Sequence, residues 1–338
     1  MKRLCWLVAL ALTQAAFAEQ DRNGALKSVP EWPASGAIPT TMQDQYVFVD
    51  RRAGQMVLAY PENLGKPEFK QSPGPLHIER FDLNNQVGAS FSVAVQVGEK
   101  SLTYSYRVAN SRTARKAIRS FNIPTAQFRG EDSLSAPEHW NKAAARSQID
   151  AMRLAIGLSS GVFLDWYSLD WNKSVIAPGQ ELGGFRVVST LRPGFVVAYV
   201  QGGGFSPSLR DEMPEAVLEQ SAPLLRKEFN SQQVLTIGPK FTADTRAAQI
   251  ARDFQIGIGK LIERKQLQGS SPAIREALQA LQLYSETDEP PLVLRAKPQP
   301  GLETEVINAL KISLPSAVER SVQMNIPLSR ISDLESGT

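Results

Sequence analysis

Two neighbouring segments of this chain alternate regularly between apolar and mostly polar side chains. In residues 89–97 every second side chain is a clear apolar one, and residues 102–108 repeat the pattern with leucine, tyrosine and valine. A period of two residues brings all of these apolar side chains to one face of a β-strand. A short turn at Gly98 joins the segments, so together they predict a β-hairpin with one face against a core.

The stretch from residue 161 to residue 204 is denser in β-type runs, aromatic residues and turn residues than its surroundings. Its apolar runs predict three strands, at residues 162–166, 184–189 and 195–201. Two turn dipeptides, Pro178-Gly179 and Pro193-Gly194, lie between these runs. We interpret this stretch as one half of a β-sandwich, with residues 88–124 supplying the other half.

Shorter segments predict the remaining elements of this region. Residues 45–50 and 55–60 form a hairpin around Gly54, and a further strand is expected at residues 76–83. Residues 114–123 fit either a strand or a helix, and we favour the strand because a β-type run precedes it and Pro124 closes it. Residues 142–156 are expected to form a short helix inserted in the sheet domain.

After Gly204 the sequence takes on helical periodicity. An apolar stripe with three- and four-residue spacing runs through residues 244–263. Ser271 and Pro272 are an N-cap followed by a first-turn proline, which predicts the start of a second helix. Residues 302–310 predict another short helix. We therefore expect residues 206–338 to form a small α-helical domain with a polar tail.

The first residues have the three parts of a secretory signal peptide. Residues 1–18 begin with Lys2 and Arg3, continue with a short apolar stretch, and end with a small-x-small site at Ala18. The only cysteine of the sequence, Cys5, lies within this leader, so the mature chain is expected to have no disulfide, thiol nucleophile or cysteine-based metal site. Residues 19–44 predict an extended N-terminal leader to the first domain.

These features predict an exported protein, periplasmic or extracellular, without a transmembrane segment in the mature chain, because no later run approaches the ~20 apolar residues of a membrane-spanning helix. The 338 residues with 42% hydrophobic content can bury substantial cores. The formal net charge is +3, and two of these charges belong to the leader. Nucleic-acid binding needs a stronger basic excess or a clustered face, so nucleic acid is excluded as an expected partner.

The run Tyr104-Ser-Tyr-Arg-Val-Ala-Asn110-Ser resembles the "Y-x-V-x-N" strand of bacterial immunoglobulin-like domains. Ile176-Ala-Pro-Gly179, which leads into residues 184–189, is similar to a late-strand pattern in exported sandwich proteins of unknown function. The resemblance covers roughly residues 89–204 and implies an all-β immunoglobulin-like sandwich and a location outside the cytoplasm. We expect the sandwich domain to extend over residues 45–205. It supplies no catalytic residue, and the small α-helical domain would follow as a second domain.

The sequence has no catalytic motif in the context that its chemistry requires. His77 and His139 are the only histidines, and no H-E-x-x-H pattern is present. Residues 157–161 have the spacing G-x-S-x-G, but they follow an expected helix, whereas the nucleophile serine of that motif follows a strand. We therefore predict no catalytic residue, no metal site and no cofactor. Asp165 and Asp170 are the alternative, because paired carboxylates could serve a carbohydrate-active hydrolase. Five residues apart on one strand, however, they would point to opposite faces.

Two groups of residues are candidates for binding. The aromatic group could stack on sugars or on a partner protein, or could fill the core instead; it consists of Trp140, Trp166, Tyr167 and Trp171. The basic group could meet an anionic polymer or phosphate, or could be an ordinary solvated face; it consists of Arg112, Arg115, Lys116 and Arg119.

The leading hypothesis is an exported, non-enzymatic binding or interaction protein of the bacterial envelope, with a glycan or an envelope protein as its partner. A purely structural envelope protein is a further alternative, and it predicts that the tryptophans are buried.

Overall fold

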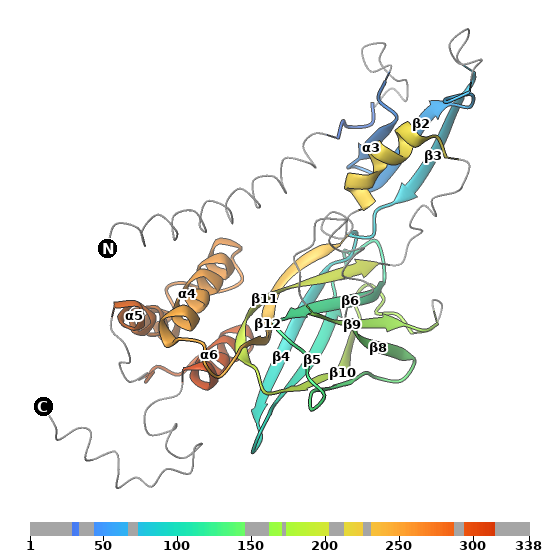
Figure 1. Ribbon diagram of the computed structural model, residues 1–338. Coiled ribbons are helices and arrows are strands. Elements are labelled where there is room, and N and C mark those ends of the chain that lie inside the picture. The colour runs from blue at the N-terminus through green and yellow to red at the C-terminus, as the bar shows by residue number, and fades with distance from the viewer. Residues whose placement is uncertain are drawn as a thin grey trace, which may run out of the picture.

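The computed structural model of the protein describes residues 29–33, 44–66, 74–145, 162–170, 174–202, 213–225, 231–286 and 294–314 (Figure 1). Within these residues the chain forms three antiparallel β-sheets and four helices. The smallest sheet and helix α3 (Glu215–Leu225) lie at one end of the molecule in Figure 1, and the other helices lie beyond the two larger sheets.

The two larger sheets pack face to face as a β-sandwich. One has the strand order β4 (Ala89–Val97), β5 (Leu102–Asn110), β10 (Glu181–Ser189) and β7 (Ser133–Ser135). The other has the order β12 (Gln232–Phe241), β11 (Arg192–Gly202), β6 (Ile118–Thr125), β9 (Val162–Ser168) and β8 (Trp140–Ala145). The alternating sequence of β4 and β5 turns one face of the first sheet toward the second.

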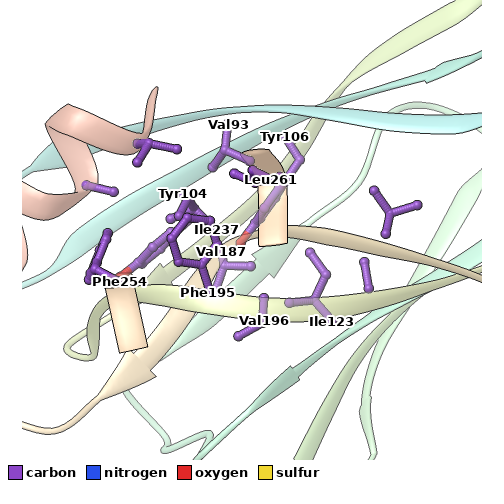
Figure 2. Close-up of a cluster of buried hydrophobic side chains, with 14 of the residues drawn as sticks. Val93, Tyr104, Tyr106, Ile123, Val187, Phe195, Val196, Ile237, Phe254 and Leu261 are labelled. Atoms are coloured by element: carbon purple, nitrogen blue, oxygen red, sulfur yellow. The ribbon is translucent and has the colours of Figure 1, made fainter. Parts of the chain in front are cut away.

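Aromatic side chains occupy the space between these sheets. Trp166 of β9 is fully buried, and its ring stacks on Phe121 of β6 with centroids 5.0 Å apart. Phe185 of β10 meets Phe121 edge-on at 4.9 Å, so the two sheets are joined directly by aromatic contacts. Figure 2 shows further core side chains from both sheets, among them Tyr106 and Ile123.

Helix α4 (Ala247–Glu263) packs on Phe195 of β11. The centroids of the Phe195 and Phe254 rings lie 5.4 Å apart, and a Cβ at Gly257 would come within 2.0 Å of the Phe195 ring. Asp253 of α4 accepts the Phe195 N–H at 3.0 Å and forms an ion pair with Lys240 of β12. The absence of a side chain at Gly257 therefore lets α4 sit directly on the strand.

The last two helices complete the same core. Helix α5 (Pro272–Glu286) packs on α4, and α6 (Leu302–Ser313) packs on β4 and β11. Arg192, at the start of β11, donates to the carbonyl oxygens of Ser313 at 3.2 Å and Thr242 at 2.9 Å. Since buried residues of these helices and of the sandwich form one continuous hydrophobic cluster, the expected division into two domains is not confirmed.

The smallest sheet has its own cores, one on each face. It consists of β1 (Val47–Asp50), β2 (Gln55–Pro61) and β3 (Leu76–Asp82). Helix α3 covers one face with the buried side chain of Val217, and Gln220 Oε1 accepts the Tyr46 N–H at 2.8 Å. Trp32 packs edge-on against Phe48 on the other face. Helix α3, which lies in the sequence between strands β11 and β12 of the sandwich, thus returns to the N-terminal sheet.

Most of the predicted elements are present. The structure confirms the hairpins β1–β2 and β4–β5, the strands β9, β10 and β11, and the helices α4, α5 and α6. Residues 118–125 form strand β6, which agrees with the favoured alternative for this segment.

Two expectations are wrong. Residues 142–145 belong to strand β8, where Lys142 pairs with Trp166, because pairing with β9 overrides the local helical pattern; residues 146–156 lie outside the described segments. Strand β12 was missed within the region expected to be helical. It pairs with β11 from Gln232 onward and completes the second sheet of the sandwich.

Candidate functional site

A groove of about 750 Å³ lies over the outer face of β4, β5 and β10, the face turned away from the sandwich core. The sheet forms its floor, and residues 297–301 with the first turns of α6 form its wall. The groove therefore combines side chains from the hairpin, from a strand about eighty positions later, and from the C-terminal helix.

Small side chains make up the floor. In the strand register Ala94 of β4 is paired with Ser105 of β5, and Ser105 is paired with Arg186 of β10. The register of β10 shifts between Leu182 and Phe185, which leaves Gly183 and Gly184 opposite a single residue of β5, Arg107. Gly184 has φ of 94°, a conformation that favours glycine. The floor is low because alanine, serine and glycine occupy these positions.

The wall is fixed to the floor through Glu305 of α6. β4 is an edge strand of its sheet, and the N–H of Val93 donates to Glu305 Oε2 at 3.0 Å. Burial raises the pKa of Glu305 above its ordinary value, whereas the hydrogen bonds from Val93 and Ser92 act in the opposite direction. The Glu305 carboxylate thus accepts a hydrogen bond from a backbone N–H of the edge strand. Without Glu305, this N–H would be open to pairing with a further strand.

Residues 297–301 are positioned by contacts at the start of α6. The Gln299 N–H donates to Glu303 Oε1 at 3.1 Å, and Ser271 Oγ donates to the same oxygen at 2.7 Å. Thr304 Oγ1 donates to the Gln299 carbonyl at 2.7 Å. Gly301, with φ of 96°, precedes the helix. The wall is therefore held by hydrogen bonds to both α5's N-cap and α6.

Basic side chains stand around the groove. Arg107 of β5 is exposed and pairs with Glu181 at 2.8 Å. Arg186 and Lys297 are also exposed, and no hydrogen bond or ion pair links the side chain of either to another described residue. Arg112 packs on Gly179, two residues before Glu181, and places a further cation next to this end of β10.

The predicted aromatic group is not assembled as a surface. Trp166 is 0% exposed and donates its indole N–H to the Ser135 carbonyl at 3.0 Å, and Trp140 is 6% exposed. Both belong to the core, the alternative that the sequence left open. Tyr167 is exposed and accepts a hydrogen bond from the Asn141 amide, and Trp171 lies outside the described residues. Of the three described members of this group, Trp140, Trp166 and Tyr167, none lines the groove.

The predicted basic group is divided in two. Arg112 and Arg115 are exposed, whereas Lys116 reaches the Asp82 carbonyl at 3.3 Å and the Asp82 carboxylate at 3.9 Å. Burial lowers the pKa of Lys116, and Asp82 partly offsets that effect. Arg119, on β6, is half-buried and has contacts of its own. Binding of an anion by the exposed arginines stays a prediction.

The acid–base candidates lie apart from the groove. Asp165 is on the outer face of β9, in register with Asn122 of β6, and Asp170 follows the end of β9. His77 belongs to β3, and His139 precedes β8. In the part of the chain that the structure describes, no group of three or more His, Cys, Asp or Glu side chains could hold a metal ion. The hydrolase hypothesis stays untested.

Sequence reasoning missed the groove residues Arg186, Lys297 and Asn308. One signal was present: adjacent glycines inside a strand, Gly183 and Gly184, often mark a bulge or a place of close approach. The position of α6 over β4 had no local signal. Among the described segments no helix has both the length and the apolar character that a membrane crossing requires.

Comparisons with known proteins return structural neighbours only. An uncharacterised protein from Nocardia farcinica with an immunoglobulin-like fold is 14% identical, with a TM-score of 0.24. The match covers 46% of this chain and 98% of the Nocardia protein. A cohesin module from a Clostridium perfringens family 33 glycoside hydrolase is 10% identical, with a TM-score of 0.24, covering 46% of this chain and 96% of its own. No family model matches the chain, and no curated protein matches it.

Proposed function

We propose that this protein is an exported, non-enzymatic binding protein of a bacterial envelope, and that the groove over β4, β5 and β10 is its ligand-binding site. The groove itself carries the proposal. Its volume of about 750 Å³ is in the range of ligand sites, roughly 300–1,000 Å³. Its floor and wall are joined by fixed hydrogen bonds, so the site is preformed.

The side chains around the groove favour binding. The Glu305 carboxylate accepts hydrogen bonds from the strand beneath it, and Arg107 is paired with Glu181. The remaining polar groups, Arg186, Lys297 and Asn308, offer ionic and hydrogen-bonding contacts to a ligand. Export is supported by the signal-peptide pattern of residues 1–18.

The test is to fill the groove. Ala94→Trp places a large ring on the floor, and Ser90→Trp is the matched control, since Ser90 is exposed on the same face of β4 but does not line the groove. Both variants and the parent protein are screened by thermal shift against envelope glycans, anionic polymers and peptide pools. A ligand at about 100 times its dissociation constant stabilises the native state by roughly 2.7 kcal/mol.

The proposal predicts a shift for at least one ligand class that Ala94→Trp removes and Ser90→Trp keeps. Equal shifts in both variants would place the ligand elsewhere. No shift in the parent protein with any class would also contradict the proposal. Circular dichroism and the unliganded Tm of both variants show whether the ring has disturbed the fold, and Ser105→Trp provides a second blocked groove if Ala94→Trp does not fold.

A further inference from the structure

We infer that the occupant of this groove is an acidic peptide segment that also carries apolar side chains. This inference rests on the proposed function and specifies the ligand class of the same site. It starts from the charges around the groove, the character of its floor, and the absence of exposed aromatic rings from its described lining.

The charges around the groove are complementary to an anion. Arg107, Arg186 and Lys297 are exposed at its rim, and of these only Arg107 has an ion-pair partner among the described residues. The carboxylate in the wall, Glu305, is turned to the β4 backbone. A guanidinium presents a planar set of donors that matches a carboxylate in two parallel hydrogen bonds. The unoccupied donors of Arg186 therefore favour ligands with carboxylates.

Apart from Glu305, the described residues of the floor and wall between these cations are uncharged. Ala94, Gly183, Pro298 and Pro300 present apolar surface to the groove, and Asn308 is exposed at the wall. A carboxamide offers one acceptor and two donors, the complement of a peptide unit. A uniformly charged polymer would leave the apolar surface unused, whereas a peptide with acidic and apolar side chains meets both kinds of surface.

The lining also disfavours a sugar chain. Recognition of sugars commonly uses the face of an exposed aromatic ring. Among the described lining residues the aromatic side chain is that of Tyr106, which is 2% exposed and belongs to the sandwich core. No ring therefore lies open to the groove along its described lining.

The experiment measures fluorescence anisotropy of short labelled peptides with the full chain. In the probe, glutamate alternates with valine and leucine, and in two reference peptides lysine or glutamine replaces every glutamate. The protein variants are Arg186→Glu and Lys297→Glu. Arg252→Glu is the matched control, because Arg252 is exposed on α4, has the same charge, and lies away from the groove lining.

The expected result is binding of the acidic peptide, with affinity roughly tenfold or more above that of the glutamine and lysine peptides. Arg186→Glu and Lys297→Glu should each weaken it by a similar factor, and Arg252→Glu should leave it unchanged. Ala94→Trp should abolish it, and Ser90→Trp should not. Binding should weaken at high salt, because opposite charges at an exposed rim are screened.

Three outcomes would overturn the inference. One is that no acidic peptide binds while a glycan shift is removed by Ala94→Trp; the groove would then be a ligand site with another ligand class. Another is that a heparin or polyphosphate probe binds as tightly and responds to Arg252→Glu equally, which indicates unspecific attraction to basic surface. The third is that Arg186→Glu and Lys297→Glu bind the acidic peptide as the parent protein does.

Discussion

Helices α4 and α6 both bury apolar side chains in the core of the sandwich, but the contact of α4 with β11 differs from the contact of α6 with the edge strand β4. α4 closes on β11, with the Phe195 ring against Gly257 and no room for even a methyl group between them. α6 holds the edge of β4 through Glu305, and beside it the outer face of the sheet remains open as a groove. The size and charge of the facing side chains account for the difference. Burying a phenylalanine ring removes a large apolar surface from water and stabilises the fold. The serine, alanine, glycine and arginine residues of the groove gain much less from burial and can stay exposed.

The largest expected effect is on the closed contact. Phe195→Ala removes a buried ring from between β11 and α4 and should lower the free energy of unfolding by about 3–5 kcal/mol. Arg186→Ala, in the open groove, should change it by no more than about 0.5 kcal/mol. Urea denaturation of both variants tests this contrast. Similar losses in the two variants would mean that the groove is part of the core.

A smaller effect is expected from the helix side of the same contact. Gly257→Ala would place a methyl group within 2.0 Å of the Phe195 ring, so the helix must move, and we expect a loss of about 2 kcal/mol. Gly259→Ala is the control, because nothing lies within 4 Å of its Cβ position. It should stabilise α4 by roughly 0.5–1 kcal/mol. Differential scanning calorimetry should show opposite shifts in Tm, and equal shifts would contradict the close packing.

The smallest effect concerns the pH dependence of stability at α6. The pKa of Glu305 is raised by burial, so its carboxyl group favours folding most when protonated, and its contribution falls as the pH rises through the raised pKa. Glu305→Gln should therefore gain stability relative to the parent protein as the pH rises from the ordinary glutamate value toward neutrality. Urea denaturation across that range measures the difference.

Glu276 on α5 is a reference for Glu305, because its pKa is shifted in the opposite direction. Its carboxylate accepts the backbone N–H groups of Ala296 and Arg295, and these bonds lower its pKa. Its contribution is present above the ordinary glutamate value and is lost as the pH falls. Glu276→Gln should therefore be less stable than the parent at neutral pH, with a difference that shrinks in acid. The same sign for both variants would contradict the assigned environment of Glu305.

Local patterns were enough to predict the elements that fold on their own periodicity. The alternation in β4 and β5 and the apolar stripe of α4 repeat over several residues, and each was assigned correctly. Strand β8 was misassigned and β12 was missed, because both depend on pairing with a partner strand rather than on their own pattern.

The groove depends on contacts that are distant in the sequence. Glu305 meets Val93 across 212 positions, and no local pattern indicates such a pairing. The burial of Trp140 and Trp166 also depends on residues that are distant in the sequence. Aromatic residues in β-type runs fit a core or an exposed surface equally well, and the position of the facing sheet decides between the two. The sequence could offer both alternatives for these rings and could not choose between them.

Hydrogen exchange with and without the acidic probe peptide tests the central claim most directly. If the groove is the binding site, the peptide should slow exchange at the described groove segments, residues 92–95, 105–107, 183–186 and 297–308. Exchange across α4 and β11 should stay as it is in the free protein, because that contact is already closed. Protection centred on α4 and β11, with none at residues 297–308, would contradict the account.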